Sequence, residues 1–341
     1  MNTISHKIEA TESDGYKRGG VAYPIRIAFA EAELFGTGAA RITHPDGREL
    51  PVQIDVDETW PDGSIKSCDV IFPLHLPANG SGTYTLETGP RILPSAEQRN
   101  PVQIDTTETG LTINQGPVTY TVRTNPFSIV DTAVFNRDVW KGTHPTGADI
   151  SGPKPFLLPG SPGPALITGD GKVLNPSHAT ITVETNGPRI GRIRAAGQYS
   201  NSLFYTSRIT FYSGVSWYRH TFELSGDTNA IASVVFEDTF DLAEGPLIAA
   251  FGARVNSHGH PTSWAVVTDG VSTIDIATRE AWNDKGHVRY ESEPDGRFRV
   301  IAPFTDKPIE TFYHFLITPP ADHYHTPAGA MVAEPHLRLL D

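Results

Sequence analysis

The fold class follows from residues 203–224, which are LFYTSRITFYSGVSWYRHTFEL. Apolar and polar side chains alternate along both halves of this stretch, and Ser213-Gly214 separates the two halves. Alternation with a period of two is typical of a strand with one buried face, and a short break containing glycine is typical of a hairpin. Similar segments rich in Val, Ile, Thr, Tyr and Phe recur from residue 23 to residue 317. The sequence therefore predicts an all-β protein.

Glycine and proline mark the ends of these segments. The 341 residues include 31 Gly and 28 Pro, and only 19% are charged, which excludes coiled coils and long helical bundles. Pro-Asp-Gly occurs at 45–47, 61–63 and 294–296, each time between strand-like runs. Proline presets the first turn angle, aspartate hydrogen-bonds locally and glycine adopts a positive φ. Each Pro-Asp-Gly is therefore predicted to close a tight hairpin.

Charge and hydropathy narrow the set of partners. The chain has 27 Lys and Arg against 39 Asp and Glu, a net charge of −12 that repels a phosphate backbone. No stretch approaches the roughly 18 apolar residues of a membrane helix, and the polar N-terminus lacks the pattern of a secretory signal. We therefore expect no nucleic-acid or membrane partner, and a chain that is cytoplasmic or part of an assembled particle.

Length and local composition predict two domains. At roughly 150 residues per domain, 341 residues correspond to about two. We place a small β-barrel domain at residues 18–95 and a larger antiparallel β-sandwich domain at residues 96–341. Residues 142–176 are so rich in Gly and Pro that they are predicted to form a long loop inside the second domain. Such a loop could be an extended arm, a lid over a site or a solvated insertion.

The same hairpin carries candidate binding residues. If Ile209 and Phe211 face the core in the first strand, and Phe222 in the second, alternation leaves four side chains together on the open face: Arg208, Tyr212, Trp217 and Arg219. Guanidinium groups clamp carboxylates and aromatic rings stack on sugars, so this face suits an acidic polysaccharide or oligosaccharide. The same side chains could instead pair by cation–π contact and cover the sheet or an interface.

Tyr218 and His220 fall on the opposite face of the hairpin. Uronate β-elimination needs a base for the C5 proton and an acid for the leaving oxygen, and these two residues are the candidates for catalysis. The alternative is a tyrosine and a histidine that are simply buried in a sandwich core.

Residues 19–87 also carry a recognisable order of motifs. These are Gly20-Val-Ala-Tyr-Pro-Ile-Arg-Ile-Ala-Phe, Leu50-Pro-Val-Gln, Trp60-Pro-Asp-Gly-Ser and Gly82-Thr-Tyr-Thr-Leu. The order resembles the N-terminal RIFT-type barrel domain of the exo-rhamnogalacturonan lyase and YetA-like family. The hairpin of residues 208–224 is similar in style to the β-sandwich domain that follows that barrel. The resemblance implies a RIFT-like barrel, a sandwich and a polysaccharide lyase acting on rhamnogalacturonan, although the family's large helical toroid is missing.

Two functions follow from these observations. The leading hypothesis is a carbohydrate-active β-protein that recognises an acidic polysaccharide and could cleave it by β-elimination. The alternative is a non-catalytic structural or glycan-adhesion module of a larger assembly, such as a surface or phage-tail component. A homo-oligomer is compatible with either function.

Two histidine pairs are the remaining candidates for chemistry. His258 and His260, and His323 and His325, are spaced two residues apart, and four imidazoles could bind a transition metal if the two segments met. Nothing in the sequence brings them together, so no metal site is assigned. The chain has no P-loop and no dinucleotide fingerprint, and we expect no cofactor.

Overall fold

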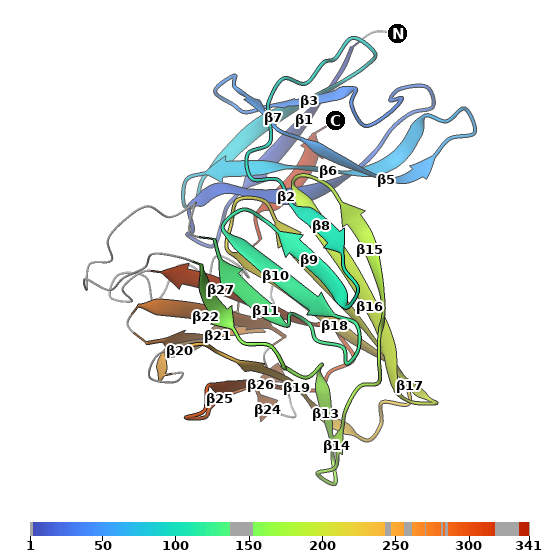
Figure 1. The fold of residues 1–341 in the computed structure, drawn as a ribbon. Helices are drawn as coiled ribbons and strands as arrows, with labels where there is room; N and C mark the ends of the chain where they lie inside the picture. Colours follow the sequence, from blue (N-terminus) through green and yellow to red (C-terminus); the bar gives the residue numbers. More distant parts are fainter. Residues whose placement is uncertain are drawn as a thin grey trace. The chain divides into compact units, whose positions relative to one another are not determined.

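The computed structural model describes residues 3–136, 153–242, 247–255, 261–269, 271–280, 282–283, 286–317 and 334–340. Within these ranges the chain forms strands and their connections and contains no helix (Figure 1). Neighbouring strands pair in antiparallel fashion. The predictions of an all-β class and of antiparallel sheets in a sandwich-like arrangement are therefore confirmed. Among the described residues, no helix is long and apolar enough to span a membrane.

The chain divides into two compact units, which we describe separately. Unit 1 comprises Met1–Pro101, Gly187–Ile190 and Glu334–Asp341, and unit 2 comprises Val102–Asn186 and Gly191–Ala333.

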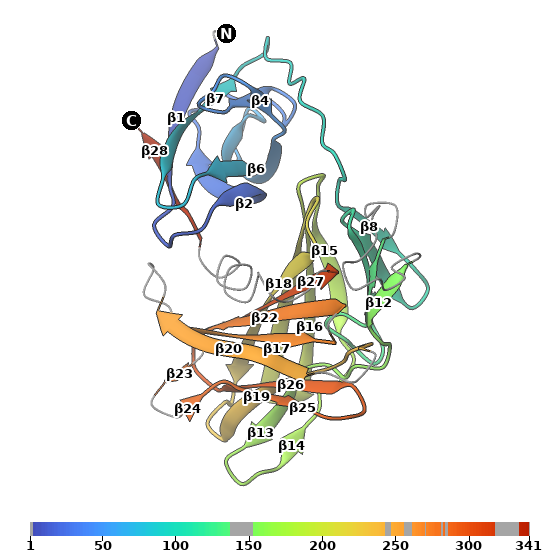
Figure 2. The ribbon, with the colours of Figure 1, turned by 90° about the vertical axis from the view of Figure 1, so that its left-hand side faces the viewer.

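Unit 1 contains two antiparallel sheets. Its strands are β1 (Ile4–Thr11), β2 (Arg18–Ala28), β3 (Ala40–Thr43), β4 (Glu49–Leu50), β5 (Gln53–Thr59), β6 (Ile65–Leu76), β7 (Ser81–Thr88) and β28 (His336–Leu340). Five of them form a sheet in the order β28-β1-β7-β3-β4, and three form a second sheet in the order β2-β6-β5. The first and last strands of the chain lie side by side (Figure 2). Alternate side chains of both sheets form one hydrophobic core that includes Ile8, Ile27, Cys68 and Leu86.

The three Pro-Asp-Gly segments close hairpins, as predicted. They connect β3 to β4, β5 to β6, and β25 (Arg289–Ser292) to β26 (Arg297–Pro303). In each turn the glycine has a positive φ, between 83° and 93°, and the aspartate accepts a hydrogen bond from the backbone N–H two residues later. The backbone bonds hold the pKa of Asp46 and Asp295 below the ordinary value, and the Ser64 hydroxyl together with the Ser64 N–H does the same for Asp62, because each bond favours the ionised form.

Unit 2 contains three larger sheets and one small one. Its other strands are β8 (Gln103–Thr106), β9 (Gly110–Asn114), β10 (Val118–Arg123), β11 (Thr132–Phe135), β12 (Lys154–Leu157), β13 (Ala165–Thr168), β14 (Val173–Leu174), β15 (Thr180–Asn186), β16 (Ile190–Ser200), β17 (Leu203–Tyr212), β18 (Trp217–Gly226), β19 (Ile231–Thr239), β20 (Leu247–Val255), β21 (Pro261–Thr268), β22 (Ser272–Arg279), β23 (Trp282–Asn283), β24 (Gly286–His287) and β27 (Ile309–Ile317). The largest sheet has eight strands in the order β15-β16-β17-β18-β27-β22-β21-β20. The two five-stranded sheets have the orders β12-β11-β10-β9-β8 and β14-β13-β19-β26-β25, and β23 pairs with β24.

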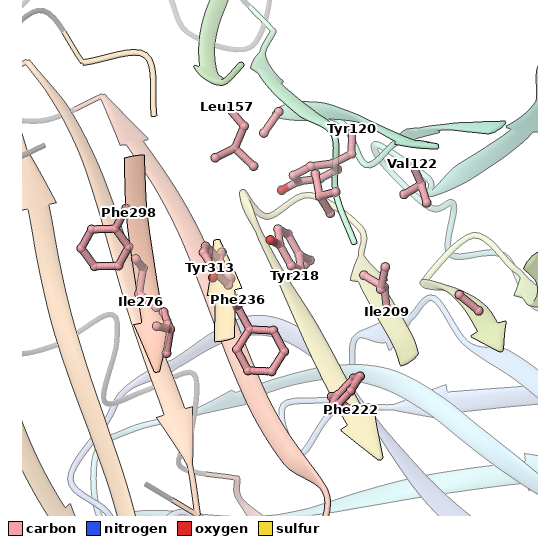
Figure 3. Close-up of a cluster of buried hydrophobic side chains, with 14 of the residues drawn as sticks. Tyr120, Val122, Leu157, Ile209, Tyr218, Phe222, Phe236, Ile276, Phe298 and Tyr313 are labelled. Carbon is pink, nitrogen blue, oxygen red and sulfur yellow. The ribbon is translucent and has the colours of Figure 1, made fainter. Parts of the chain in front are cut away.

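One face of the eight-stranded sheet packs against both five-stranded sheets. The ring of Phe222 contacts Phe236 of β19 with centroids 5.8 Å apart, and the ring of Phe211 contacts Tyr120 of β10 at 5.2 Å. All four belong to one hydrophobic cluster, of which Figure 3 shows Tyr120, Phe222 and Phe236. Burying large apolar side chains of this kind contributes about 1.5–3 kcal/mol each. The shared core fixes which face of the hairpin at 203–224 points inward, and so which side chains occupy the other face.

Part of the predicted loop at residues 142–176 forms strands instead. Residues 142–152 lie outside the described part of the chain, but residues 153–176 contain three short strands, β12, β13 and β14. β12 is at the edge of its sheet, where a proline such as Pro155 is tolerated because its missing N–H is not needed for pairing. Richness in proline therefore did not prevent strand formation here.

Candidate functional site: one face of the eight-stranded sheet

The face of the eight-stranded sheet opposite the core carries a concentrated set of polar and aromatic side chains. Strand register puts Trp217 opposite His314, and His314 opposite Asp275. It likewise puts Arg219 opposite Phe312. Directly paired residues of antiparallel strands lie on the same face of the sheet. We call this surface the site face and define it by nine residues: Arg208, Tyr212, Trp217, Arg219, Asp275, Arg279, Glu310, Phe312 and His314.

A carboxylate between two guanidinium groups occupies the middle of the site face. The Glu310 carboxylate contacts Arg219, and its Oε2 lies 2.6 Å from Nη1 of Arg279. Both guanidinium groups also lie over the ring of Phe312, at 5.8 Å for Arg219 and 5.6 Å for Arg279. The Arg279 side chain is only 8% exposed, and that of Arg219 is 27% exposed. Cation–π contacts and ion pairs together fix the orientation of these groups.

Arg208 is also compensated by carboxylates. Its Nε lies 3.3 Å from Oε1 of Glu184, and its Nη1 lies 3.5 Å from Oε1 of Glu223. The side chain is 38% exposed, the most accessible of the three arginines. Each guanidinium group of the site face therefore already has an acidic partner within the protein.

The aromatic side chains of the site face lie partly against one another. The rings of Tyr212 and Trp217 have centroids 4.4 Å apart, and Trp217 lies 6.3 Å from Phe312. Tyr212 and Trp217 are both buried by the rest of the protein. The structure therefore brings the four predicted binding residues to one face, with the arginines more accessible than the aromatic rings.

Asp275 and His314 form a pair beside Trp217. Oδ2 of Asp275 lies 3.6 Å from Nδ1 of His314. Both atoms are buried, and neither has a hydrogen-bond partner among the described residues. The Asp275 side chain is 3% exposed and that of His314 is 16% exposed, so the pair reaches from the floor of the site face toward the solvent.

Tyr218 and His220 face the core. Tyr218 stacks on Tyr313 with ring centroids 5.2 Å apart and an interplanar angle of 10°, and burial raises the pKa of its hydroxyl well above the ordinary value. The ring nitrogens of His220 lie 3.3 Å from Thr311 Oγ1 and 3.2 Å from Ser207 Oγ. Burial lowers the pKa of His220 to about 3. Both side chains are therefore neutral near pH 7 and lie within the packed interior.

Alternation in the hairpin predicted only four of the nine residues of the site face. Asp275 and Arg279 come from β22, and Glu310, Phe312 and His314 come from β27, far along the chain from the hairpin. Alternation in the stretch Ile309-Glu-Thr-Phe-Tyr-His-Phe could have put the last three on one face. The sequence pattern does not predict that β27 pairs with β18.

His258, His260, His323 and His325 all lie outside the described residues. Within the described ranges, no group of three or more His, Cys, Asp or Glu side chains is arranged to hold a metal ion.

Comparisons with known proteins give a likeness in fold alone. No family model matches the sequence, and no curated protein matches it. A solved structure of a glycosyl hydrolase family 38 protein from Enterococcus faecalis is similar with a TM-score of 0.60 and 12% identity. An α-mannosidase from Enterococcus faecalis is similar with a TM-score of 0.52 and 11% identity. In both comparisons 99% of this chain is covered, and the chain spans 47% and 46% of those two proteins.

These findings correct two expectations. The resemblance to the exo-rhamnogalacturonan lyase and YetA-like family is wrong, because no family model matches and the similar solved structures are glycoside hydrolases. The expected rhamnogalacturonan lyase function is wrong on the same grounds, and the RIFT-type barrel named by the resemblance has no support. The β-elimination roles of Tyr218 and His220 depended on that function, so we no longer assign them to these residues.

Proposed function

We propose that this chain is a carbohydrate-recognising β-module and that the site face binds the sugar. The fold likeness to a glycosyl hydrolase family 38 protein and an α-mannosidase supports a role in carbohydrate metabolism. Because the match covers less than half of each of those proteins, we propose recognition for this chain, without hydrolysis.

The observation that carries the proposal is the fixed polar array around Glu310. Sugar-binding sites combine an aromatic surface with a few polar groups held in place before the ligand arrives. Here Arg219 and Arg279 are held by Glu310 and by the ring of Phe312. A guanidinium group has five N–H donors in a planar fork, a geometry that can bind a carboxylate and a sugar hydroxyl at the same time.

A neutral glycan is the favoured ligand. An acidic glycan would have to compete with Glu310 for Arg219, and with Glu184 and Glu223 for Arg208. The hydroxyl groups of a neutral sugar can bind to these ion pairs without separating them. An acidic glycan is the second candidate, favoured by the 38% exposure of Arg208 and its long ion-pair distances.

The homo-oligomer that the sequence allows stays a prediction.

Affinity gel electrophoresis and calorimetry with two soluble polymers test this function. We expect the protein to bind α-mannan, a neutral polymer suggested by the second neighbour's name, more tightly than polygalacturonate. Arg219→Gln should weaken that binding about tenfold, the effect of one charge-assisted hydrogen bond. Arg299→Gln is the matched control, because Arg299 is paired with Glu237 on another sheet and is similarly exposed at 30%. A protein that binds neither polymer, or equal loss of binding in both variants, would contradict the proposal.

A further inference from the structure

We propose that Asp275 and His314 form a subsite that binds two adjacent free hydroxyl groups of a neutral sugar ring. This inference rests on the proposed function and deepens it, since it assigns the ligand's chemistry at one point of the site face. Asp275 lies on β22 and His314 on the neighbouring strand β27, directly opposite each other in register.

The strongest observation is a buried carboxylate oxygen that lacks a hydrogen bond. Oδ2 of Asp275 is buried and has no hydrogen-bond partner among the described residues, and the same holds for Nδ1 of His314. Most buried polar atoms in folded proteins have a partner, because leaving one unsatisfied is costly. The 3.6 Å between the two atoms is too long for a hydrogen bond. The pair therefore keeps hydrogen-bonding capacity that the protein itself does not use.

The chemistry of the two groups points to hydroxyls. A carboxylate accepts hydrogen bonds, and a neutral imidazole can donate from one nitrogen and accept at the other. Neighbouring hydroxyls on a sugar ring are both donors and acceptors, so one can donate to the carboxylate while the other bonds to the imidazole. A second carboxylate from an acidic sugar would instead meet the charge of Asp275 at close range, which is unfavourable.

The neighbours of the pair fit a sugar ring. Trp217 is directly opposite His314 in the register, so its aromatic ring, which is buried, lies beside the two polar groups. Arg219 is two residues from Trp217 on the same face of β18, where its guanidinium group contacts Glu310. Exposure rises from Asp275 at 3% through His314 at 16% to Arg219 at 27%. Because Asp275 Oδ2 and His314 Nδ1 are themselves buried, a hydroxyl pair that binds them must displace the groups that cover them, while the rest of the sugar remains nearer the solvent.

The test compares binding and thermal stability in the same variants. Asp275→Asn keeps the shape of the side chain and removes its charge, and His314→Gln removes the imidazole. Asp105→Asn is the control, because Asp105 is exposed on β8 in the same unit. The probes are α-mannan and O-methylated α-mannan, in which capped hydroxyls can no longer donate.

We expect Asp275→Asn to weaken α-mannan binding about 10- to 100-fold, the range for a hydrogen bond to a charged group. We expect the wild type to prefer α-mannan over its methylated form, and Asp275→Asn and His314→Gln to lose most of that preference. The melting temperature of Asp275→Asn should be unchanged or higher, because an unsatisfied buried charge is removed. The control should match the wild type in every measurement.

Three results would overturn the inference. If Asp275→Asn binds α-mannan like the wild type, the subsite is wrong while the proposed function stands. If Asp275→Asn melts at a lower temperature and binds normally, the pair serves only the fold. If the wild type binds neither α-mannan nor polygalacturonate, the proposed function fails, and the inference fails with it.

Discussion

Replacing Glu310 by glutamine tests whether ion pairs hold the site face together. The Glu310 carboxylate contacts Arg219 and Arg279, and the change leaves both guanidinium groups without that charge partner. Removing one member of a buried ion pair typically costs about 3–5 kcal/mol. Because Arg219 is 27% exposed and partly screened by water, we expect the lower end, about 3 kcal/mol.

Urea unfolding and calorimetry would measure this effect. A loss of about 3 kcal/mol corresponds to a fall of roughly 6–12 °C in the melting temperature for a unit of this size. The control is Glu237→Gln, which breaks the partly exposed pair with Arg299 and should cost less than about 1 kcal/mol. Adding Arg279→Met to Glu310→Gln should recover part of the loss, because one of the two cations that contact Glu310 is removed. Equal stability losses for Glu310→Gln and Glu237→Gln would show that the buried ion pairs of Glu310 do not hold the site face together.

Three further predictions concern the turns, the core and the thiol. Gly296→Ala should destabilise the protein more than Gly47→Ala in urea unfolding. Both glycines have a positive φ, but only at position 296 would a new Cβ lie close to another atom, 2.8 Å from the carbonyl oxygen of Phe240. Equal losses in the two variants would contradict this. Burial raises the pKa of Asp238 from 3.8 to about 7, so stability should fall as the pH rises between those values, while the unfolded chain ionises and the folded one does not. Asp238→Asn should flatten that pH profile, and an unchanged slope would argue against it. Burial raises the pKa of Cys68 to about 12, so an aromatic disulfide reagent should label it only after unfolding, and rapid labelling of the native protein would contradict the structure.

The local features of the fold could be predicted because they depend on neighbouring residues. The alternation in residues 203–224 is enough to give a hairpin and its two faces. The Pro-Asp-Gly turns follow from the conformations that proline and glycine allow, and the hydrogen bond from Ser64 N–H to Asp62 Oδ1 at 2.9 Å shows the aspartate acting as expected.

Distant strand pairings could not be predicted. β28 pairs with β1 across almost the whole chain, and β27 pairs with β18 about 90 residues away in sequence. Alternation fixes which side chains share a face of one strand, but it carries no information about the partner strand. The site face needs Glu310 and Asp275 from such distant strands, so only its hairpin half was predictable.

The failed family resemblance has a physical explanation. Its most specific parts were the Leu50-Pro-Val-Gln and Trp60-Pro-Asp-Gly-Ser motifs, and in the second motif Trp60, Asp62 and Ser64 make local contacts. Trp60 Nε1 donates to the carbonyl oxygen of Phe29 at 3.1 Å, and Ser64 Oγ donates to Asp62 at 2.6 Å. Any β-protein with this turn can use the same residues, so the motif is evidence for a hairpin and does not identify a family.

A crystal structure of the protein with a neutral α-mannan oligosaccharide would show directly where the sugar binds. We expect a sugar ring on the site face, with hydroxyl groups within hydrogen-bond distance of Asp275 and His314 and with the ion pairs of Glu310 intact. A sugar bound on another surface, with the site face free of ligand, would contradict this expectation.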